Sequence, residues 1–208
     1  PELFSALQVV VDEHKDYRYI LSGSSGFLLM QNISQTLAGR VAVTRLLPLS
    51  ISELKEDANI DTNTLMWKGF YPGVWGDGKD PGNVYDSYVS TYLQRDVRQI
   101  LNIKDLSLFQ KFLTIVASRV GNVFIASSIA SELGVDYKTI QSWMSILETS
   151  YTAFLLQPFH RNIGKRMTKT PKVYFYDVGL VCHLLGIENE QHIKTHPLRG
   201  AIFENMVV

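Results

Sequence analysis

The chain has 208 residues, of which 46% are hydrophobic and 19% charged, and 20 Lys and Arg residues balance 20 Asp and Glu residues. This composition suits one large globular domain or two small ones, and a nucleic-acid surface would have to come from a local patch. A single cysteine, Cys182, excludes an internal disulfide and a zinc knuckle, and no apolar run is long enough to cross a membrane. We therefore expect a cytoplasmic protein without membrane contact.

The first quarter of the chain alternates between helical and strand-like patterns. Apolar spacing predicts a helix over 2–13, and an apolar run predicts a buried strand over 17–21. A helix over 26–39 and a second strand over 41–47 follow. This order is typical of an α/β fold with a parallel sheet. Two strands are too few for such a sheet, so we expect the others to precede Pro1.

Residues 51–103 are predicted to be a loop-rich insertion followed by a helical linker. Glycines and prolines crowd the stretch 55–83 and indicate an irregular loop, whereas apolar side chains recur at helical spacing from Val84 onward. The glycine-rich segment here is no phosphate loop. A P-loop requires GxxxxGK[ST] after a strand, and Lys79 is followed by Asp80.

The sharpest local signal is IASELGVDYKTIQSWM, residues 129–144, which predicts a helix-turn-helix. Ala130 is small enough to let two helices approach, and Gly134 can adopt the positive φ of a tight turn. Asp136 is placed to cap the second helix, and Ile140 lies on its inward side. The exposed side of that helix offers residue types that meet bases and phosphates: Tyr137, Lys138, Gln141 and Ser142.

Two short apolar stretches, 153–156 and 173–176, follow and predict a hairpin. The segment between them has no acidic residue and five basic ones: Arg161, Lys165, Arg166, Lys169 and Lys172. A helix-turn-helix followed by a hairpin with a basic tip is the outline of a winged helix, which we assign to residues 104–187. The second helix and the tip form a candidate surface for duplex DNA, although such modules also bind proteins.

Seven segments, in order, carry a resemblance to a known family. They are PELFSALQVVVDE, RYILSGSSGFLLM, SQTLAGRVAV, LLPLS, STYLQRDVRQI, KTPKVYFYDVGL and HPLRGAIFENMVV. The chain resembles predicted prokaryotic AAA-type P-loop ATPases that carry a winged helix after the ATPase core and then a nuclease-like domain. The resemblance implies that residues 1–50 end the ATPase core and that residues 188–208 begin the nuclease-like domain. The Walker A and Walker B motifs would precede Pro1.

The resemblance also implies roles for individual residues. Ser22, Gly23 and Ser24 match the polar end of the sensor strand, which lies beside the nucleotide γ-phosphate, where the two serines would position the attacking water. Arg40 matches an arginine finger, whose planar fork suits phosphate oxygens. Glu204 matches the first acidic residue of the nuclease-like domain, where it would help to hold Mg²⁺. From the residues alone, the serines could equally cap a helix and Arg40 could be a surface side chain.

Three functions follow from these patterns. We expect the intact protein to be an AAA-type ATPase that uses ATP and Mg²⁺, with a winged helix for duplex DNA, for other protein domains or for further copies of the chain. The first alternative is a DNA-binding regulator without ATPase activity. The second is a metal-dependent nuclease whose remaining acids lie beyond Val208. Because it lacks the phosphate loop, the chain alone should neither bind ATP tightly nor hydrolyse it.

Overall fold

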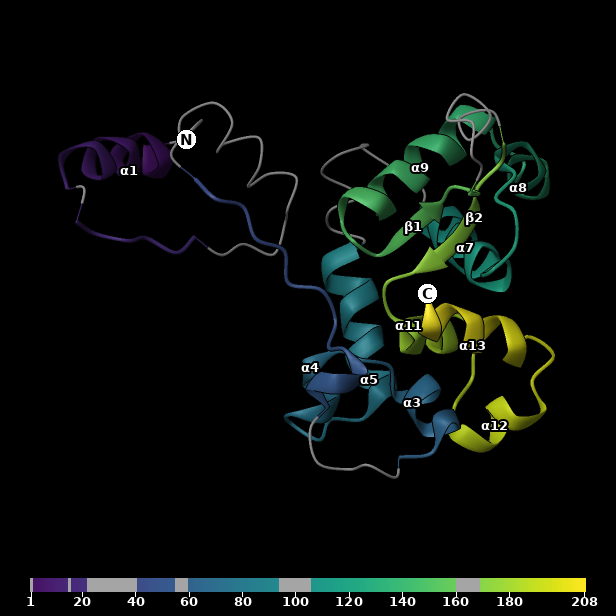
Figure 1. Ribbon diagram of the computed structural model, residues 1–208. Coiled ribbons are helices and arrows are strands. Elements are labelled where there is room, and N and C mark those ends of the chain that lie inside the picture. Colours follow the sequence, from purple (N-terminus) through teal and green to yellow (C-terminus); the bar gives the residue numbers. More distant parts are fainter. Residues whose placement is uncertain (1, 15, 22–40, 55–59, 94–105, 160–168) are drawn as a thin grey trace. The chain divides into compact units, whose positions relative to one another are not determined.

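The computed structural model of the chain describes residues 2–14, 16–21, 41–54, 60–93, 106–159 and 169–208 (Figure 1). The chain divides into two units, Pro1–Leu46 and Leu47–Val208. The described residues are mostly helical and include a small antiparallel sheet of two strands. No helix among them is both long enough and apolar enough to cross a membrane.

The unit Pro1–Leu46 contains helix α1 (Glu2–Glu13), in agreement with the predicted helix over 2–13. The segments 17–21 and 41–47, which the sequence predicts as parallel strands, have no regular secondary structure. The predicted helix over 26–39 lies outside the described residues.

The missing strands have a physical reason. A strand exists only when its N–H and C=O groups pair with a neighbouring strand, and the described residues of this unit contain no such neighbour. The apolar side chains of these segments are also uncovered, since Ile20 is 94% exposed and Leu46 is fully exposed. The expected parallel sheet is therefore not formed by the described residues, although the apolar character that predicted it is present.

The stretch predicted as an irregular loop is helical over much of its described length. Its helices are α3 (Thr62–Lys68), α4 (Pro72–Trp75) and the beginning of α5 (Pro81–Ser87). A short 3-10 turn, Ile51–Glu53, precedes this stretch, and a π-helix, Tyr88–Leu93, follows α5 where the sequence predicts helical structure from Val84 onward. The apparent loop signals are helix starts. Pro81 occupies the first turn of α5, and the Asp80 side chain accepts the Asn83 N–H at 3.1 Å.

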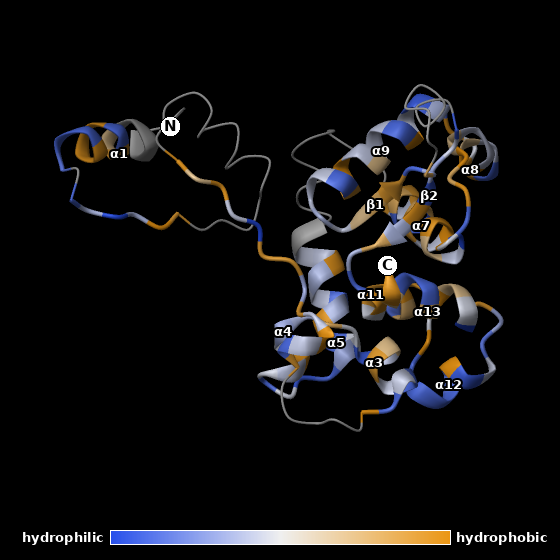
Figure 2. Ribbon diagram, viewed as in Figure 1, coloured by the Kyte–Doolittle hydropathy of each residue, from blue (hydrophilic) through white to orange (hydrophobic). Residues whose placement is uncertain are grey.

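The elements after residue 105 follow the predicted order. They are α7 (Leu106–Ser118), α8 (Ala126–Leu133), α9 (Tyr137–Thr149), β1 (Ala153–Leu156) and β2 (Lys172–Phe175). The strands pair antiparallel, with Ala153 opposite Phe175, and Val123 adds an isolated bridge to Lys172. Figure 2 shows apolar and polar residues on different sides of α9, as expected for a helix that covers a core with one face.

Three helices complete the chain: α11 (Val178–Leu184), α12 (Glu190–Thr195) and α13 (Arg199–Val207). Helix α11 is the centre of the larger unit. Its residues 178–182 are all buried, and it contacts α3, α5, α7, α13 and β2 (Figure 1). One apolar cluster includes Met66 of α3, Trp143 of α9 and Ile202 of α13. The stretch before residue 104 and the helix-turn-helix region therefore share a core.

Asp177, directly before α11, is the polar centre of this core. Its side chain is almost fully buried and accepts three hydrogen bonds. The donors are the Phe70 N–H at 2.6 Å, the Tyr85 hydroxyl at 2.6 Å and the Leu180 N–H at 2.8 Å. The first two lie about a hundred residues earlier in the chain, so one carboxyl group joins the start of α4, helix α5 and helix α11.

Two glycines make this arrangement possible. Gly69 has φ +63°, and a Cβ atom there would lie 2.1 Å from the Tyr85 hydroxyl and 2.7 Å from the Gly179 Cα. A Cβ atom at Gly179 would in turn lie 2.7 Å from the Gly69 Cα. Both positions therefore exclude any side chain, because the backbone at Gly69 lies directly against the backbone at Gly179.

Burial raises the pKa of Asp177, and the hydrogen bonds from Tyr85, Phe70 and Leu180 oppose that rise. Burial also raises the pKa of the Tyr85 hydroxyl far above its usual value, with the charge of Asp177 adding to the effect. The pKa of the Cys182 thiol rises to about 12 for the same two reasons. Tyr85 and Cys182 are thus neutral donors, and the Cys182 thiol donates to the Met66 carbonyl at 3.3 Å.

We predict that Tyr85→Phe lowers the free energy of unfolding by about 1.5–3 kcal/mol, the usual contribution of a hydrogen bond to a charged group. Because this bond lowers the pKa of Asp177, the loss should be largest where Asp177 is charged. It should shrink as the pH falls through the folded-state pKa. Urea unfolding at several pH values measures this, with the exposed Tyr137→Phe as the matched control. Equal stability of the two variants would contradict the prediction.

Candidate functional site

The helices and the turn predicted for residues 129–144 are present as α8 and α9. Gly134 ends α8 in the left-handed conformation, with φ 68° and ψ 32°, and its N–H donates to the Ala130 carbonyl. Asp136 caps α9, since its Oδ1 accepts the Lys138 N–H at 2.8 Å. Both local predictions, the glycine turn and the aspartate cap, are confirmed.

Aromatic packing fixes the position of α9. Trp143 is buried, and its ring meets Phe109 edge-on at 5.5 Å and Phe112 at 5.3 Å, both on α7. Ala130 and Ile140 are buried where α8 and α9 cross. One face of α9 therefore packs on α7, and the opposite face is exposed to solvent.

The residues predicted to meet bases and phosphates lie together on that solvent side. They occupy the first two turns of α9, and all of them are exposed: Tyr137, Lys138, Gln141 and Ser142. Tyr137 is 47% exposed despite its aromatic ring. An exposed tyrosine, a lysine and an amide on one helical face form a surface that can hydrogen-bond and carries one positive charge.

The hairpin supplies fewer of its predicted cations to the described surface. Arg161, Lys165 and Arg166 lie outside the described residues. Lys169 is exposed just before β2. Lys172 is the first residue of β2 and forms an ion pair with Glu204 of α13, with 2.8 Å between Nζ and Oε1.

Glu204 has two partners on β2. Besides Lys172, the Tyr174 hydroxyl donates to its Oε1. The bond from Lys172, and then the bond from Tyr174, lower the pKa of Glu204, and the same pair raises the pKa of Lys172. The stability that the Lys172–Glu204 pair contributes is therefore fully present above the ordinary pKa of a glutamate. It is lost as the pH falls through the lowered pKa of Glu204. It adds little stability, since both side chains are nearly half exposed.

A metal at Glu204 has no further support in the described part of the chain. No group of three or more His, Cys, Asp or Glu side chains is placed there to hold a metal ion. The neighbours of its carboxylate are a lysine and a tyrosine, which are hydrogen-bond donors rather than metal ligands. The residues present do not by themselves fit Mg²⁺, and the metal role of Glu204 stays a prediction.

Asn205, which no sequence pattern marks as important, joins α13 to β2. It is buried, its Nδ2 donates to the Phe175 carbonyl at 3.1 Å, and its Oδ1 accepts the Phe175 N–H at 2.7 Å. One side chain thus satisfies both backbone groups of a strand residue. The neighbouring Lys172–Glu204 pair lies on the same two elements, so the hairpin and α13 are joined at two points.

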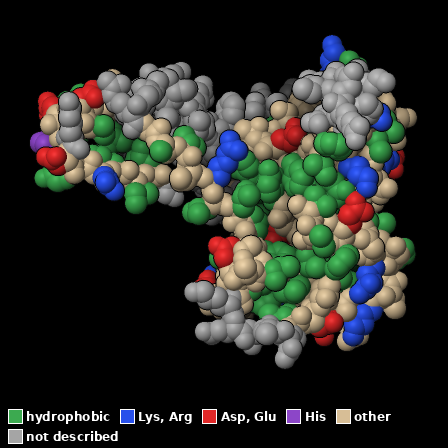
Figure 3. Space-filling model, viewed as in Figure 1, with side chains coloured by type: hydrophobic (Ala, Val, Ile, Leu, Met, Phe, Trp, Pro, Cys, Tyr) green, Lys and Arg blue, Asp and Glu red, His purple; other side chains and the backbone are tan. Residues whose placement is uncertain are grey.

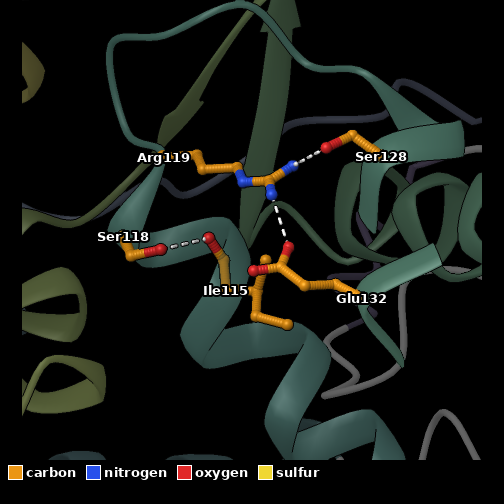
Figure 4. Close-up of polar contacts among 5 residues, drawn as sticks. All are labelled: Ile115, Ser118, Arg119, Ser128 and Glu132. Atoms are coloured by element: carbon orange, nitrogen blue, oxygen red, sulfur yellow. Dashed lines mark hydrogen bonds and ion pairs between the residues drawn. The ribbon is translucent and has the colours of Figure 1, made fainter. Parts of the chain in front are cut away.

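Arg119 fastens α7 to α8 in a comparable way (Figure 4). Its guanidinium donates to the Glu132 carboxylate and, at 3.3 Å, to the Ser128 hydroxyl, both on α8. Figure 4 also shows Ser118 donating to the Ile115 carbonyl at the end of α7. Arg119 is an unremarkable basic residue in the sequence, and only the fold brings Glu132 within its reach.

Charge on the visible face of the larger unit is mixed. Figure 3 shows the Lys and Arg side chains of the described residues dispersed there rather than gathered in one place. The predicted catalytic and nucleotide-binding residues Ser22, Gly23, Ser24 and Arg40 lie outside the described residues. The described candidate surface therefore consists of the exposed face of α9 together with Lys169.

Comparison with known families also divides the chain into two parts. Residues 59–191 match a family described as a domain of unknown function (DUF8612). This chain belongs to that family. The matched residues begin just before α3 and end within α12, so the DUF8612 region includes α11 and the helix-turn-helix. Residues 1–55 match a second family, described as an AAA domain, and to that extent resemble AAA-type ATPases.

Curated relatives of this DUF8612 protein are themselves uncharacterized proteins. One from Mycobacterium bovis and one from Mycobacterium tuberculosis are each 29% identical to it over 211 residues, which covers 100% of this chain and 47% of theirs. One from Haemophilus influenzae is 22% identical over 183 residues, covering 80% of this chain and 46% of its own. The chain thus spans about half the length of the curated relatives it matches. No solved structure matches it.

We predict that Asn205→Ala weakens the attachment of α13 to the hairpin and lowers the free energy of unfolding by about 2–4 kcal/mol, because two buried backbone groups of Phe175 lose their partners. Hydrogen exchange of the Phe175 amide should become faster, and urea unfolding measures the stability. The exposed Asn83→Ala is the control, with an expected change within about 0.5 kcal/mol. Unchanged Phe175 exchange in the Asn205 variant would contradict the role of this contact.

Proposed function

We propose that the intact protein is an AAA-type ATPase whose DUF8612 region carries a winged helix-turn-helix that binds duplex DNA. The observation that carries the proposal is the match of residues 1–55 to an AAA domain in the same chain as the α8–α9 pair. The chain covers only about half of its curated relatives, so the nucleotide chemistry is proposed for the intact protein.

The order of elements supports the winged helix. Helix α7 is followed by a bridge at Val123, then by α8, α9 and the β1–β2 hairpin. The bridge joins Val123 to Lys172, so the segment between α7 and α8 lies along the outer edge of β2. The Gly121 N–H donates to the Val173 carbonyl at 2.9 Å, and the Phe124 N–H donates to the Pro171 carbonyl at 2.8 Å. A winged helix has this arrangement, with the wing between its last two strands.

The exposed face of α9 supports DNA as the ligand. The second helix of such a pair enters the major groove with its N-terminal residues toward the bases, and these are the turns that carry Tyr137, Lys138 and Gln141. Lys138 suits a phosphate or a guanine, and Gln141 suits an adenine. The five basic residues of segment 160–172 would add phosphate contacts from the wing.

Within this proposal the polar end of segment 18–25 senses nucleotide. Ser22 and Ser24 position the attacking water, with Gly23 allowing close approach to the γ-phosphate. Arg40 acts as an arginine finger toward ATP·Mg²⁺ in a neighbouring copy of the protein. An arginine in trans requires an oligomer, so further copies of the chain belong among its partners.

We predict that Arg40→Ala in the complete protein lowers the rate of ATP hydrolysis by about 10³-fold or more while nucleotide binding persists, because the finger acts on the transition state. Phosphate release measures the rate, and a fluorescent ATP analogue measures binding. Arg18→Ala, an exposed arginine of the same unit, is the matched control. Unchanged hydrolysis by the Arg40 variant would exclude the finger, and no hydrolysis by the unmodified complete protein would favour a DNA-binding regulator.

We predict that Lys138→Gln weakens binding to duplex DNA and lowers the slope of log affinity against log salt by about 0.9, the value for one lost phosphate contact. Adding Lys169→Gln should lower the slope by a similar amount again. Fluorescence anisotropy with a labelled duplex, between low and moderate salt, measures both. Lys194→Gln on α12 is the matched control, since α12 packs on α3 and α13.

The DNA assignment fails if the Lys138 and Lys194 variants bind alike. It also fails if heparin competes as well as duplex DNA does, because that result indicates a general polyanion surface. Cleavage of the duplex in the presence of Mg²⁺ would instead favour the nuclease alternative.

A further inference from the structure

A cavity of about 350 Å³ lies beside α11. Its walls come from three helices and from the segment that follows the last of them. Trp67 is on α3, Tyr85 is on α5, His183 is on α11, and Glu188 follows the turn after α11. The volume is in the range of sites for small ligands or single side chains.

The charged residues in the cavity wall are acidic. Asp80 and Glu188 contribute carboxylates, and both are exposed to solvent. Among the described residues that line the cavity, none is Lys or Arg. The nearby lysines are engaged elsewhere, since Lys79 pairs with Asp77 at 2.7 Å and Lys68 lies 4.9 Å over the ring of Trp75. The cavity therefore has a negative rim without an internal counter-charge.

Two aromatic residues, the half-buried Trp67 and the buried Tyr85, are among those that line the cavity. The hydroxyl of Tyr85 points to Asp177, so the ring is held with its polar end in the core. The imidazole of His183 lies 5.9 Å from that ring and 3.3 Å from the Asp86 carboxylate. Burial lowers the pKa of His183, and Asp86 opposes the shift. An uncharged imidazole beside Tyr85 and Trp67 adds no positive charge to the site.

We propose that this cavity binds an organic cation, a guanidinium or primary ammonium group on a short alkyl chain. The half-buried ring of Trp67 attracts a cation through its π electrons and covers its alkyl chain, while Asp80 and Glu188 pair with its N–H groups. An inorganic cation fits less well, because two separated carboxylates and aromatic walls do not supply the six or more oxygen ligands that Mg²⁺ or Ca²⁺ takes.

Two sources can present this chemistry, namely a free amine and an Arg or Lys side chain of a protein segment. The probes are therefore agmatine, which carries a guanidinium and an ammonium group, and the blocked tripeptide acetyl-Gly-Arg-Gly-amide. Pentanoate and pentanol, of similar length, report on anionic and neutral ligands. Tighter binding of agmatine identifies a free amine, and tighter binding of the peptide identifies a side chain.

The tryptophans provide the readout in the complete chain labelled with ¹⁵N-tryptophan. Agmatine should shift the indole N–H signal of Trp67 with saturation. The signal of Trp143, packed against Phe109 and Phe112, should stay in place. Calorimetry gives the affinity.

Charge removal tests the carboxylates without removing the helix cap. Asp80→Asn keeps a good N-cap for α5, and Glu188→Gln alters an exposed position. The double variant should bind agmatine about tenfold more weakly, as expected for two partly exposed ion pairs. Asp77→Asn, an acid paired with Lys79 outside the cavity wall, is the matched control and should leave the affinity unchanged.

Three outcomes would overturn the proposal. The first is the absence of a saturable Trp67 shift with either cationic probe. The second is an equal response to pentanol or pentanoate. The third is an equal affinity of the double variant and the Asp77 control for agmatine, with unfolding curves showing that all variants are folded.

Discussion

The larger unit depends on one buried carboxyl group. Asp177 lies in an apolar core, where a charge is tolerated only if donors surround it, and its donors come from Phe70, Tyr85 and Leu180. These donors belong to segments that cannot reach Asp177 unless α3, α5 and α11 are packed together. The absence of side chains at Gly69 and Gly179 completes the fit. The carboxyl group therefore selects one packing arrangement out of many that would bury the same apolar residues.

That arrangement places α11 between two parts of the chain that the sequence predicts as separate. Helix α11 contacts α3 and α5 and also α7 and β2. The support beneath the helix-turn-helix is thus continuous with the short helices before it. Trp143 joins α9 to α7, and α7 in turn contacts α11, so α9 is connected to α11 through α7.

Local features of this fold could be predicted from sequence, and non-local ones could not. The turn at Gly134, the cap at Asp136 and the inward Ile140 depend on neighbours within a few positions, and all three are present. Asp177, Arg119 and Asn205 act on partners that are 107, 13 and 30 positions away in the chain. No spacing rule reveals such partners. The strand over 17–21 failed for the same reason, because a strand is defined by a distant neighbour that local pattern cannot supply.

The positive charge of Lys172 on the hairpin has two candidate partners. Lys172 can neutralise Glu204 or a DNA phosphate, and the exposed pair is weak enough for a polyanion to replace Glu204. Replacing Glu204 in this pair would not affect the two hydrogen bonds between Asn205 and Phe175, because they are buried and uncharged. Under the proposed function, DNA would therefore free the Glu204 carboxylate while α13 stays on β2. The consequence of binding at the hairpin would then be an unpaired carboxylate on α13 rather than a displacement of the helix.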